Sequence, residues 1–414
     1  MRFIHTADWH LGRLFHGVHL TEDQHYALMQ LVALVESERP DAVLVAGDIY
    51  DRAIPPPEAV ELLDEVLCKL VIDLKIPVVL IAGNHDSPQR LNFGARLLAN
   101  RRLYVTGNLP KRCESVVFRD AHGPVHVYAL PYCEPMIVRE CLECPEVGDH
   151  DSAMRALVAR IRATHTNGDR KILMAHAFVA GGAECESERP LSVGGAGTVD
   201  AASLGGFDYV ALGHLHGPQR IGAGEVRYSG SLLKYSFDEA HQPKGVYLIE
   251  MDGRGACDVR TVPITARRDV RRIEGLMDDL MRGPTDGRSR EDYLEVTVTD
   301  DGPVLDAIGR LREVYPNVMS LRRPEKVGGA GAGDRPDIRG KTALQLFGAF
   351  YRHVTADDLS PEQEAAFAGV VEATERADRE MSNVKSQMSK VGEGGGEMSK
   401  VNSPMLKVGE GVGA

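Results

Sequence analysis

Five short motifs place aspartate, histidine and asparagine side chains where they could bind metal ions. They are Asp8-x-His10, Gly47-Asp48-x-x-Asp51, Gly83-Asn84-His85-Asp86, a single His176, and Gly213-His214-x-His216. These side chains offer nitrogen and oxygen donors, and none is a thiolate. Such a set favours Mn²⁺, Mg²⁺, iron or Zn²⁺ over a structural zinc site built from cysteines. Two such cations held side by side can activate water, orient a phosphate and neutralise a transition state.

Predicted strands position these motifs. Apolar, β-branched segments at 1–7, 42–46 and 77–82 each lead directly into one of the first three motifs. Helical segments at 23–38 and 57–71 separate them, so the sequence predicts an α/β core with a β-α-β-α-β order. Because parallel strands end at the same edge of a sheet, the three motifs would converge there. Further strands are expected at 124–130, 171–176, 208–213, 225–229 and 244–250.

Spacing within the motifs supports a shared site. Two side chains separated by one residue, as in Asp8-x-His10 and His214-x-His216, point to the same side of an extended chain. A carboxylate has two oxygens, so Asp48, on the central strand, is the natural bridge between two cations. Any single motif also has a structural explanation, because Gly-Asp after a strand is ordinary turn chemistry. The five motifs together favour metal binding, since several polar side chains at buried strand ends are costly without a purpose.

Composition and charge limit the class of protein. A chain of 414 residues predicts two or three domains. The net charge of −12 argues against a protein that coats nucleic acid, since such binding depends on neutralising phosphates. Bound dications or a basic partner could still bring phosphates to a small site.

Cysteine usage and hydropathy predict a cytoplasmic location. The seven cysteines are an odd number scattered through a large chain, which suits a reducing compartment. The Cys141-x-x-Cys144 pair has no second pair at zinc-finger spacing, so we interpret it as incidental. The sequence has neither a signal peptide at its start nor an apolar run long enough for a membrane span, so we expect no membrane contact.

Changes in composition suggest five regions. Residues 1–265 form the α/β core, and an arginine-rich, smaller α/β domain follows at 266–325. A glycine-rich stretch at 326–340 predicts a flexible linker. Two helices are expected within 341–380, and 381–414 is a low-complexity tail that contains MSKV and KVGEG twice each.

The two C-terminal helices have clear sequence signals. An apolar stripe on the first helix comprises Leu344, Phe347, Tyr351 and Val354. The second helix begins with Ser360 as N-cap and Gln363 three residues later, which predicts a capping box. Such a pair could dock on a partner by its apolar stripe or simply pack on its own chain.

The five motifs resemble those of the calcineurin-like metallophosphoesterase superfamily. Within it, the chain is similar to the SbcD nuclease subunits of bacterial SbcCD complexes, chiefly through HTADWHLGR at 5–13 and SERPLSVGG at 187–195. Other similar stretches are VAGDIYDRAIPP at 45–56, AGNHDSPQRL at 82–91, YVALGHLHGPQ at 209–219, YSGSLLKYSFDE at 228–239 and LFGAFYRHV at 346–354. The resemblance covers about residues 1–380 and implies layered β-sheets flanked by helices, with a small capping domain and C-terminal helices.

The resemblance implies a role for each motif residue. One metal would be held by Asp8, His10, Asp48 and His216, and the other by Asp48, Asn84, His176 and His214. His85 matches the family's catalytic histidine, and Asp86 would orient its ring. Asp51 could help to orient it or could cap a helix start. Arg13, Arg52 and Arg90 flank the motifs and could hold DNA phosphates, although ordinary surface arginines explain them equally well.

The same resemblance implies a metal-dependent DNA nuclease of a double-strand-break repair complex. It would act as a 3′→5′ exonuclease on duplex ends and as an endonuclease at hairpins or blocked ends. Its cofactors would be two divalent metal ions, with Mn²⁺ expected. Its partners would be DNA and an SbcC-type ATPase with a coiled coil. The chain would form a homodimer within a heterotetramer, with residues 266–325 as the DNA-capping domain and the helix pair on the coiled coil.

Three other readings stay open from the sequence. A phosphomonoesterase or cyclic-nucleotide phosphodiesterase would use the same fold and metals, because fold does not settle substrate. A non-catalytic scaffold would have lost metal ligands, whereas all seven are present here. A mainly structural DNA tether would make nuclease activity secondary.

Overall fold

The computed structural model describes residues 1–165, 168–188, 197–222, 224–302, 304–324, 342–355, 357–374 and 376. The chain divides into two compact units, Met1–Arg323 and Pro324–Ala414. The predicted linker at 326–340 and the tail at 381–414 lie outside the described residues, as does 189–195 of the SERPLSVGG motif.

The first sheet has six strands and carries the first three motifs. Its order is β16 (Cys257–Pro263), β15 (Gly245–Met251), β1 (Arg2–Thr6), β4 (Ala42–Val45), β5 (Val78–Ile81) and β6 (Leu103–Thr106). Strands β1, β4, β5 and β6 are parallel, and β15 runs antiparallel to β1. Helices α1 (Thr21–Glu38) and α2 (Pro57–Leu67) connect the parallel strands. The predicted β-α-β-α-β order is therefore confirmed.

The second sheet also has six strands and carries the last two motifs. Its order is β13 (Gln219–Ile221), β14 (Val226–Tyr228), β12 (Tyr209–Gly213), β9 (Arg170–His176), β8 (Gly123–Leu130) and β7 (Val116–Asp120). Strands β8, β9, β12 and β14 are parallel to one another, and the edge strands β7 and β13 are antiparallel to them. The ends of β9 and β12 therefore lie side by side. Helices α5 (Pro135–Leu142) and α6 (His150–Thr164) follow β8.

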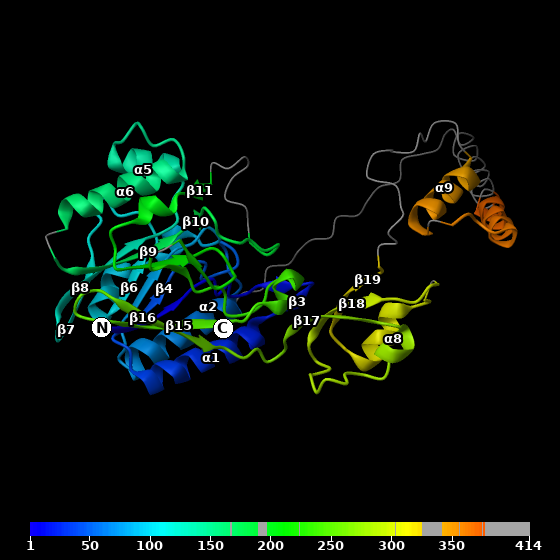
Figure 1. Cartoon of the computed structure of the whole chain (residues 1–414), viewed down its shortest axis with the longest axis horizontal. Helices are drawn as coiled ribbons and strands as arrows, with labels where there is room; N and C mark the ends of the chain where they lie inside the picture. The colour runs from blue at the N-terminus through cyan, green and yellow to red at the C-terminus, as the bar shows by residue number, and fades with distance from the viewer. Residues whose placement is uncertain are drawn as a thin grey trace, which may run out of the picture. The chain divides into compact units, whose positions relative to one another are not determined.

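Alternation along the strands explains why the two sheets stack. Leu44 packs in the core between the sheets, together with Ile172 of the second sheet, while its neighbour Val43 packs on the opposite side in the core that includes α1 and α2. In the second sheet Leu173 packs toward α6 in the same way. Because both faces of each sheet are buried, the strands read as continuous apolar runs. The result is a four-layer arrangement of helices, two sheets and helices (Figure 1).

A smaller parallel sheet follows the core. It consists of β17 (Val270–Gly275), β18 (Tyr293–Val298) and β19 (Val318–Arg322), with α7 (Met277–Leu280) and α8 (Ala307–Val314). Its own apolar cluster includes Val296 and Leu311. Strand β17 has no clear strand signal in the sequence, because two of its six residues are arginines. The structure pairs one of them, Arg271, with the buried Asp292 at 2.7 Å.

Residues of the second unit form a pair of helices. Helix α9 spans Ala343–Thr355, and a second helix spans 361–374. The capping box is confirmed, because the Ser360 and Gln363 side chains exchange hydrogen bonds with each other's backbone N–H groups. Phe347 of α9 stacks on Phe367 with ring centroids 4.0 Å apart, and Tyr351 accepts a hydrogen bond from Gln363. Part of the predicted apolar stripe is therefore used inside the helix pair, while Phe350, Val354 and Val370 are exposed.

Shorter elements complete the described chain. The strands are β2 (Leu14–Phe15), β3 (Val18–His19), β10 (Phe178–Val179) and β11 (Thr198–Val199), and the short helices are α3 (Pro88–Leu91) and α4 (Ala95–Leu98). A π-helix, η1 (Cys68–Asp73), extends α2, and three 3-10 turns are η2 (Ala99–Arg101), η3 (Ala201–Leu204) and η4 (Phe237–His241). Within the described residues, no helix has the length and apolar character needed to cross a bilayer.

Candidate metal centre

The loops after the strands hold the motif residues in unusual backbone conformations. Asp8, His10 and Asp48 have φ values of 54°, 47° and 49°, and His214 has 111°. Residues other than glycine rarely adopt positive φ, and such strain concentrates at functional sites. Backbone hydrogen bonds of 3.0 Å stabilise the loops, from the N–H of Asp8 to the carbonyl of Gly47 and from that of His10 to the carbonyl of Asp48.

Two glycines of the motifs are required by close packing. A Cβ atom at Gly47 would collide with the His176 ring, and one at Gly83 would collide with the Asp48 carboxylate. Gly47 also has a φ of +95°, which favours glycine. The absence of a side chain at each position lets the motif residues that follow strands β4, β5 and β9 lie close together.

Asp48 lies at the centre of the cluster. Its Oδ2 atom is 3.6 Å from Nε2 of His10 and 3.4 Å from Nε2 of His176. Its Oδ1 atom accepts a hydrogen bond of 2.9 Å from the backbone N–H of His85, which fixes the carboxylate orientation. One carboxylate thus faces a histidine on each side, as a ligand bridging two cations would.

Asn84 and two histidines form one group of donor atoms. The Asn84 Oδ1 atom is 2.9 Å from Nε2 of His176 and 3.2 Å from Nδ1 of His214. Nδ1 of His176 lies 2.9 Å from the carbonyl oxygen of Ala46. A carbonyl only accepts, so Nδ1 carries a proton, and Nε2 is the ring atom that a cation in this group would bind. Asp48, His176 and His214 form one of the residue groups with geometry suited to a metal.

A second group lies on the other side of Asp48. Nε2 of His10 is 3.0 Å from Nε2 of His216, so two ring nitrogens face each other in a buried place. Oδ2 of Asp8 and Nδ1 of His10 are buried and have no hydrogen-bond partner among the described residues. Two donor atoms that are each about 2.1 Å from a shared cation lie about 3 Å from each other when their bonds to the cation are at right angles. Asp8, His10 and Asp48 form a residue group suited to a metal, and His216 adds the ring nitrogen that faces His10, so the four side chains fit a cation.

Electrostatics of the cluster also fit bound cations. Burial raises the pKa of the Asp8 carboxyl well above its ordinary value, and the negative Asp48 adds to this. Burial acts in the same direction on Asp48, but His176 and the other nearby histidines hold the pKa of Asp48 well below its usual range. Burial lowers the pKa of His10 well below its ordinary value and that of His214 to about 3. The neutral rings of His10 and His214 can therefore act as ligands at neutral pH. Burial acts in the same direction on His176, but the carboxylates of Asp48 and Asp8 raise the pKa of His176 to about 9, so a cation that binds this ring would displace a proton.

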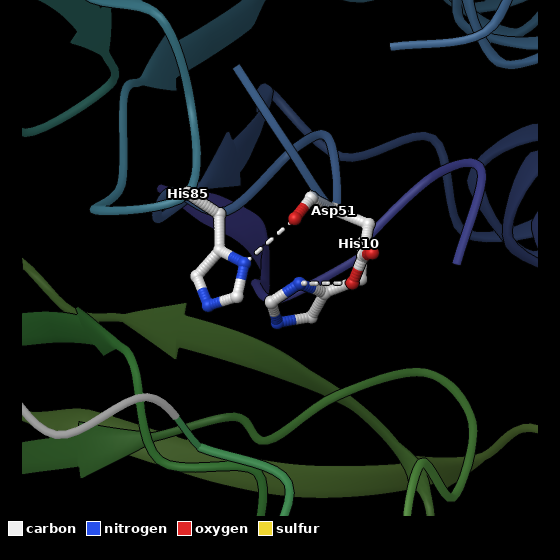
Figure 2. Close-up of side chains that lie close together, drawn as sticks. All are labelled: His10, Asp51 and His85. Atoms are coloured by element: carbon white, nitrogen blue, oxygen red, sulfur yellow. Dashed lines mark hydrogen bonds and ion pairs between the residues drawn. The ribbon is translucent and has the colours of Figure 1, made fainter. Parts of the chain in front are cut away.

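His85 lies beside this cluster and is oriented by a backbone group. Its Nδ1 atom is 2.8 Å from the carbonyl oxygen of Asp51, and its ring centroid is 4.6 Å from that of His10. Figure 2 shows His85, Asp51 and His10 converging, with the Asp51 carboxylate 3.7 Å from Nδ1 of His10. These three residues are a third group suited to a metal.

The expected role of Asp86 as the partner of the His85 ring is wrong. The Asp86 carboxylate instead accepts backbone N–H groups from Ile49, Tyr50 and Gly83 at 2.9–3.0 Å. Burial raises the pKa of Asp86 to about 7, with the charge of Asp48 as the next cause. Asp86 therefore joins the loops that carry Asp48 and Asn84. The His85 ring is oriented by the Asp51 carbonyl and not by the Asp86 carboxylate.

The three flanking arginines differ in their surroundings. Arg13 donates to the Asp51 carboxylate at 3.0 Å and to the Ser187 carbonyl at 3.2 Å, and it lies over the Tyr235 ring. Arg52 and Arg90 are exposed. Arg13 is thus already engaged in positioning residues of the site, whereas the other two arginines remain candidates for phosphate contact.

Three buried residues near His216 were missed from the sequence. Ser187, Glu239 and Lys244 form a hydrogen-bonded network behind its ring. Ser187 belongs to SERPLSVGG and Glu239 to YSFDE, so both lie in stretches that carry the family resemblance. The resemblance pointed to these stretches without giving a role to either residue. Only the folded chain shows that both lie behind the His216 ring.

Comparisons with known proteins agree with this geometry. The family model described as calcineurin-like phosphoesterase matches residues 1–218, and one described as type 5 capsule protein repressor C-terminal domain matches 266–355. The SbcD nuclease of the SbcCD complex of Staphylococcus epidermidis is 34% identical over 321 residues, which are 78% of this chain and 85% of that protein.

Solved structures similar to the chain include TT1561 of Thermus thermophilus, with a TM-score of 0.38, and a dimetal phosphatase from Danio rerio, with a TM-score of 0.37. Both are 14% identical in sequence, and each match covers 64% of this chain and 99% of the other. The sequence matches alone establish the relationship, through the family model on the first half of the chain and the nuclease relative along most of its length. The chain belongs to the calcineurin-like phosphoesterase family and, within it, to the SbcD group of nuclease subunits.

Proposed function

We propose that this chain is a metal-dependent DNA nuclease subunit that hydrolyses phosphodiester bonds. The observation that carries the proposal is the position of Asp48, whose Oδ2 atom faces His10 on one side and His176 on the other. Family membership and the name of the staphylococcal relative, a nuclease subunit, support DNA as the substrate.

The proposed ligands are the residues that the strand ends bring together. Asp8, His10, Asp48 and His216 would hold one divalent cation, and Asp48, Asn84, His176 and His214 the other. When bound, two cations supply an activated water and neutralise charge on the phosphate. The donor set suits Mn²⁺, which we propose as the ion, because nitrogen and oxygen ligands without thiolates accept it readily.

His85 is the residue best placed to move a proton at the reacting phosphate. Because the Asp51 carbonyl accepts from Nδ1, the proton on that atom is held in place and Nε2 is the ring atom left to exchange a proton. A protonated Nε2 would donate to the leaving oxygen of the cleaved strand. Arg52 and Arg90, which are exposed near the motifs, would bind neighbouring phosphates.

Activity on DNA rather than small esters tests the proposal. Hairpin and blunt duplex DNA, labelled at the 3′ or 5′ end, would be incubated with the chain and Mn²⁺, Mg²⁺ or EDTA. We expect Mn²⁺-dependent cutting at the hairpin and stepwise loss from 3′ ends. Hydrolysis of bis-p-nitrophenyl phosphate or a cyclic nucleotide, without DNA cutting even in the presence of an SbcC-type ATPase, would instead support the small-ester alternative.

A second copy of the chain is the proposed partner at one apolar groove. The groove has a volume of about 350 Å³ and is lined by residues that include Ile54, Val60 and Leu98. Ile54 is 69% exposed, and Phe93 and Leu97, which lie in the chain between the lining residues Leu91 and Leu98, are 86% and 76% exposed. Large exposed apolar side chains grouped in this way mark protein interfaces. Light scattering should give a dimer that Phe93→Asp with Leu97→Asp converts to a monomer.

The helix pair is the proposed contact for a coiled-coil ATPase. Phe350 and Val354 of α9 and Val370 of the second helix are exposed, so they remain available after the two helices pack on each other. Helices commonly bind partners through such apolar side chains. Residues 266–325 would cap the DNA in the assembled heterotetramer. Loss of ATPase binding on Phe350→Asp, with DNA cutting by the isolated chain unchanged, would support this contact.

A further inference from the structure

The hydroxyl of Ser187 lies between the proposed ligand His216 and a buried carboxylate. Its Oγ atom is 2.6 Å from Nδ1 of His216 and 2.6 Å from Oε1 of Glu239. All three side chains are buried, and Glu239 is 0% exposed. Burying a charged carboxylate beside a metal ligand is costly unless it is paired and hydrogen-bonded.

Lys244 provides that pairing. Its Nζ atom is 2.5 Å from Oε2 of Glu239 and donates to the backbone carbonyl of His216 at 2.8 Å and to Ser231 at 2.9 Å. The ion pair keeps Glu239 as a carboxylate, which can only accept hydrogen bonds. Lys244 therefore contacts His216 directly through its backbone and indirectly through Glu239 and Ser187.

The directions of the hydrogen bonds follow from these chemical types. A carboxylate only accepts, so the single hydrogen of the Ser187 hydroxyl points to Glu239. The Ser187 oxygen then offers a lone pair to the His216 ring, and Nδ1 must carry a hydrogen to donate to it. In a neutral ring this leaves Nε2 without a proton. Nε2 is the atom that faces Nε2 of His10 in the proposed metal group.

We infer that Ser187, held by Glu239 and Lys244, is a positioning residue that fixes the tautomer and ring orientation of His216 for metal binding. The inference rests on the proposed function, because it assumes that His216 is a metal ligand. Neighbours that donate or accept at the far nitrogen of a histidine ligand commonly change metal affinity by about 10- to 100-fold.

Substitutions at Ser187 and at a matched serine separate this role from simple core packing. Ser187→Ala removes the hydroxyl that accepts from Nδ1 of His216 and leaves that nitrogen 3.6 Å from Oε1 of Glu239, beyond hydrogen-bond distance. Ser187→Thr keeps the hydroxyl. Ser236→Ala is the control, because the Ser236 hydroxyl donates to the same Glu239 oxygen, at 3.2 Å, but has no hydrogen bond to His216 within the described residues. His216→Ala tests the ligand role itself. Each chain would be checked for an unchanged melting temperature.

Two measurements do not depend on nuclease activity. Nitrogen NMR of metal-free protein labelled at histidine, with His216 assigned by the His216→Ala spectrum, should show Nδ1 protonated in wild type and a mixture of tautomers in Ser187→Ala. Calorimetric titration with Mn²⁺ should show one of two sites weakened by about 10-fold or more in Ser187→Ala. Ser187→Thr and Ser236→Ala should keep the wild-type tautomer and affinity.

These measurements distinguish failure of the positioning role of Ser187 from failure of the proposed metal site. Unchanged tautomer and Mn²⁺ affinity in Ser187→Ala, alongside weakened binding in His216→Ala, would overturn the positioning role and leave the proposed function intact. Equal losses in Ser187→Ala and Ser236→Ala would assign the network to folding alone and would also overturn the inference. Wild-type Mn²⁺ binding by His216→Ala would contradict the proposed metal site itself.

Discussion

Nδ1 of His85 lies 2.8 Å from the backbone carbonyl oxygen of Asp51. A carbonyl group belongs to every residue, so this contact fixes the His85 ring without depending on any particular side chain. Asp86, the adjacent residue that could have played this part, is occupied with three backbone N–H groups of the loops that carry the proposed ligands.

This arrangement predicts different outcomes for Asp51→Ala and Asp86→Ala. Asp51→Ala retains the carbonyl, so it should reduce DNA cutting less than His85→Ala does. Asp86→Ala leaves three buried N–H groups without their acceptor and should lower the free energy of unfolding by about 3 kcal/mol. Urea unfolding of both metal-free variants measures the difference. An Asp86→Ala chain of wild-type stability that cannot cut DNA would return Asp86 to the role of orienting His85.

The position of Asp48 predicts the metal content of its variants. Because its carboxylate faces both donor groups, Asp48→Asn should lower the affinity for both cations. Asn84→Ala should weaken only the group that contains His176 and His214, since the Asn84 oxygen contacts those two rings. Metal analysis after dialysis against limiting Mn²⁺ should give close to no metal in the first variant and one ion per chain in the second. Equal loss in both would argue against a bridging carboxylate.

A buried contact should hold the small sheet on the core. The Asp23 carboxylate pairs with Arg268 at 2.6 Å and accepts from the Tyr293 hydroxyl at 2.9 Å. Asp23→Ala leaves both partners uncompensated and should lower the free energy of unfolding by about 2–3 kcal/mol. Hydrogen exchange should also increase in β17 and β18.

Glu22 offers a matched control for this contact. It pairs with Arg267 and, at 3.7 Å, with Arg268, but it is 72% exposed, and surface ion pairs contribute little. Glu22→Ala should therefore change the free energy of unfolding by less than about 0.5 kcal/mol. Similar losses in the two variants would show that the Asp23 contact has no special part in holding the sheet.

Asp120 predicts a pH dependence of stability. The Arg170 guanidinium and the N-terminal ammonium bind its carboxylate and hold the pKa of Asp120 well below its ordinary value. A depressed pKa contributes stability above the unfolded value of about 4, and this contribution is lost as pH falls further. Asp120→Asn should therefore lower the melting temperature at pH 7. The difference in melting temperature between this variant and wild type should become smaller as pH falls below 4.

Exposed Asp258 on β16 provides the comparison for Asp120. Asp258→Asn should leave the melting temperature close to that of wild type across the same pH range. A constant difference between Asp120→Asn and wild type from pH 7 to pH 3 would show that the ionised carboxylate contributes nothing to stability.

Sequence periodicity predicted the core strands because they are buried on both faces. Val78–Ile81 and Tyr209–Gly213 are uninterrupted apolar runs, and their ends match the predicted positions within a residue or two. Edge strands gave a weaker signal. In β16 every residue is half-buried or exposed, and in β17 the arginines are paired with acidic residues that only the fold brings near.

In the candidate site, too, some residues could be predicted from the sequence and others could not. Asp8, His10, Asp48, Asn84, His176, His214 and His216 could be chosen from short motifs, because strand ends of a layered sheet must meet. The contacts behind them could not be chosen in this way. The Asp51 carbonyl has no sequence signature, and Ser187 and Glu239 are 52 residues apart in the chain. Their relationship to His216 depends on loops whose paths the sequence does not specify.

Comparison of wild type and His85→Ala tests the central claim most directly. Both proteins would be loaded with Mn²⁺, analysed for metal and assayed on a labelled DNA hairpin. We predict two ions per chain in both, with cutting by His85→Ala reduced by about 100-fold or more, as expected for loss of a proton-transfer group. Undiminished cutting by metal-loaded His85→Ala, or a wild-type chain that binds no Mn²⁺ and still cuts in EDTA, would contradict the account.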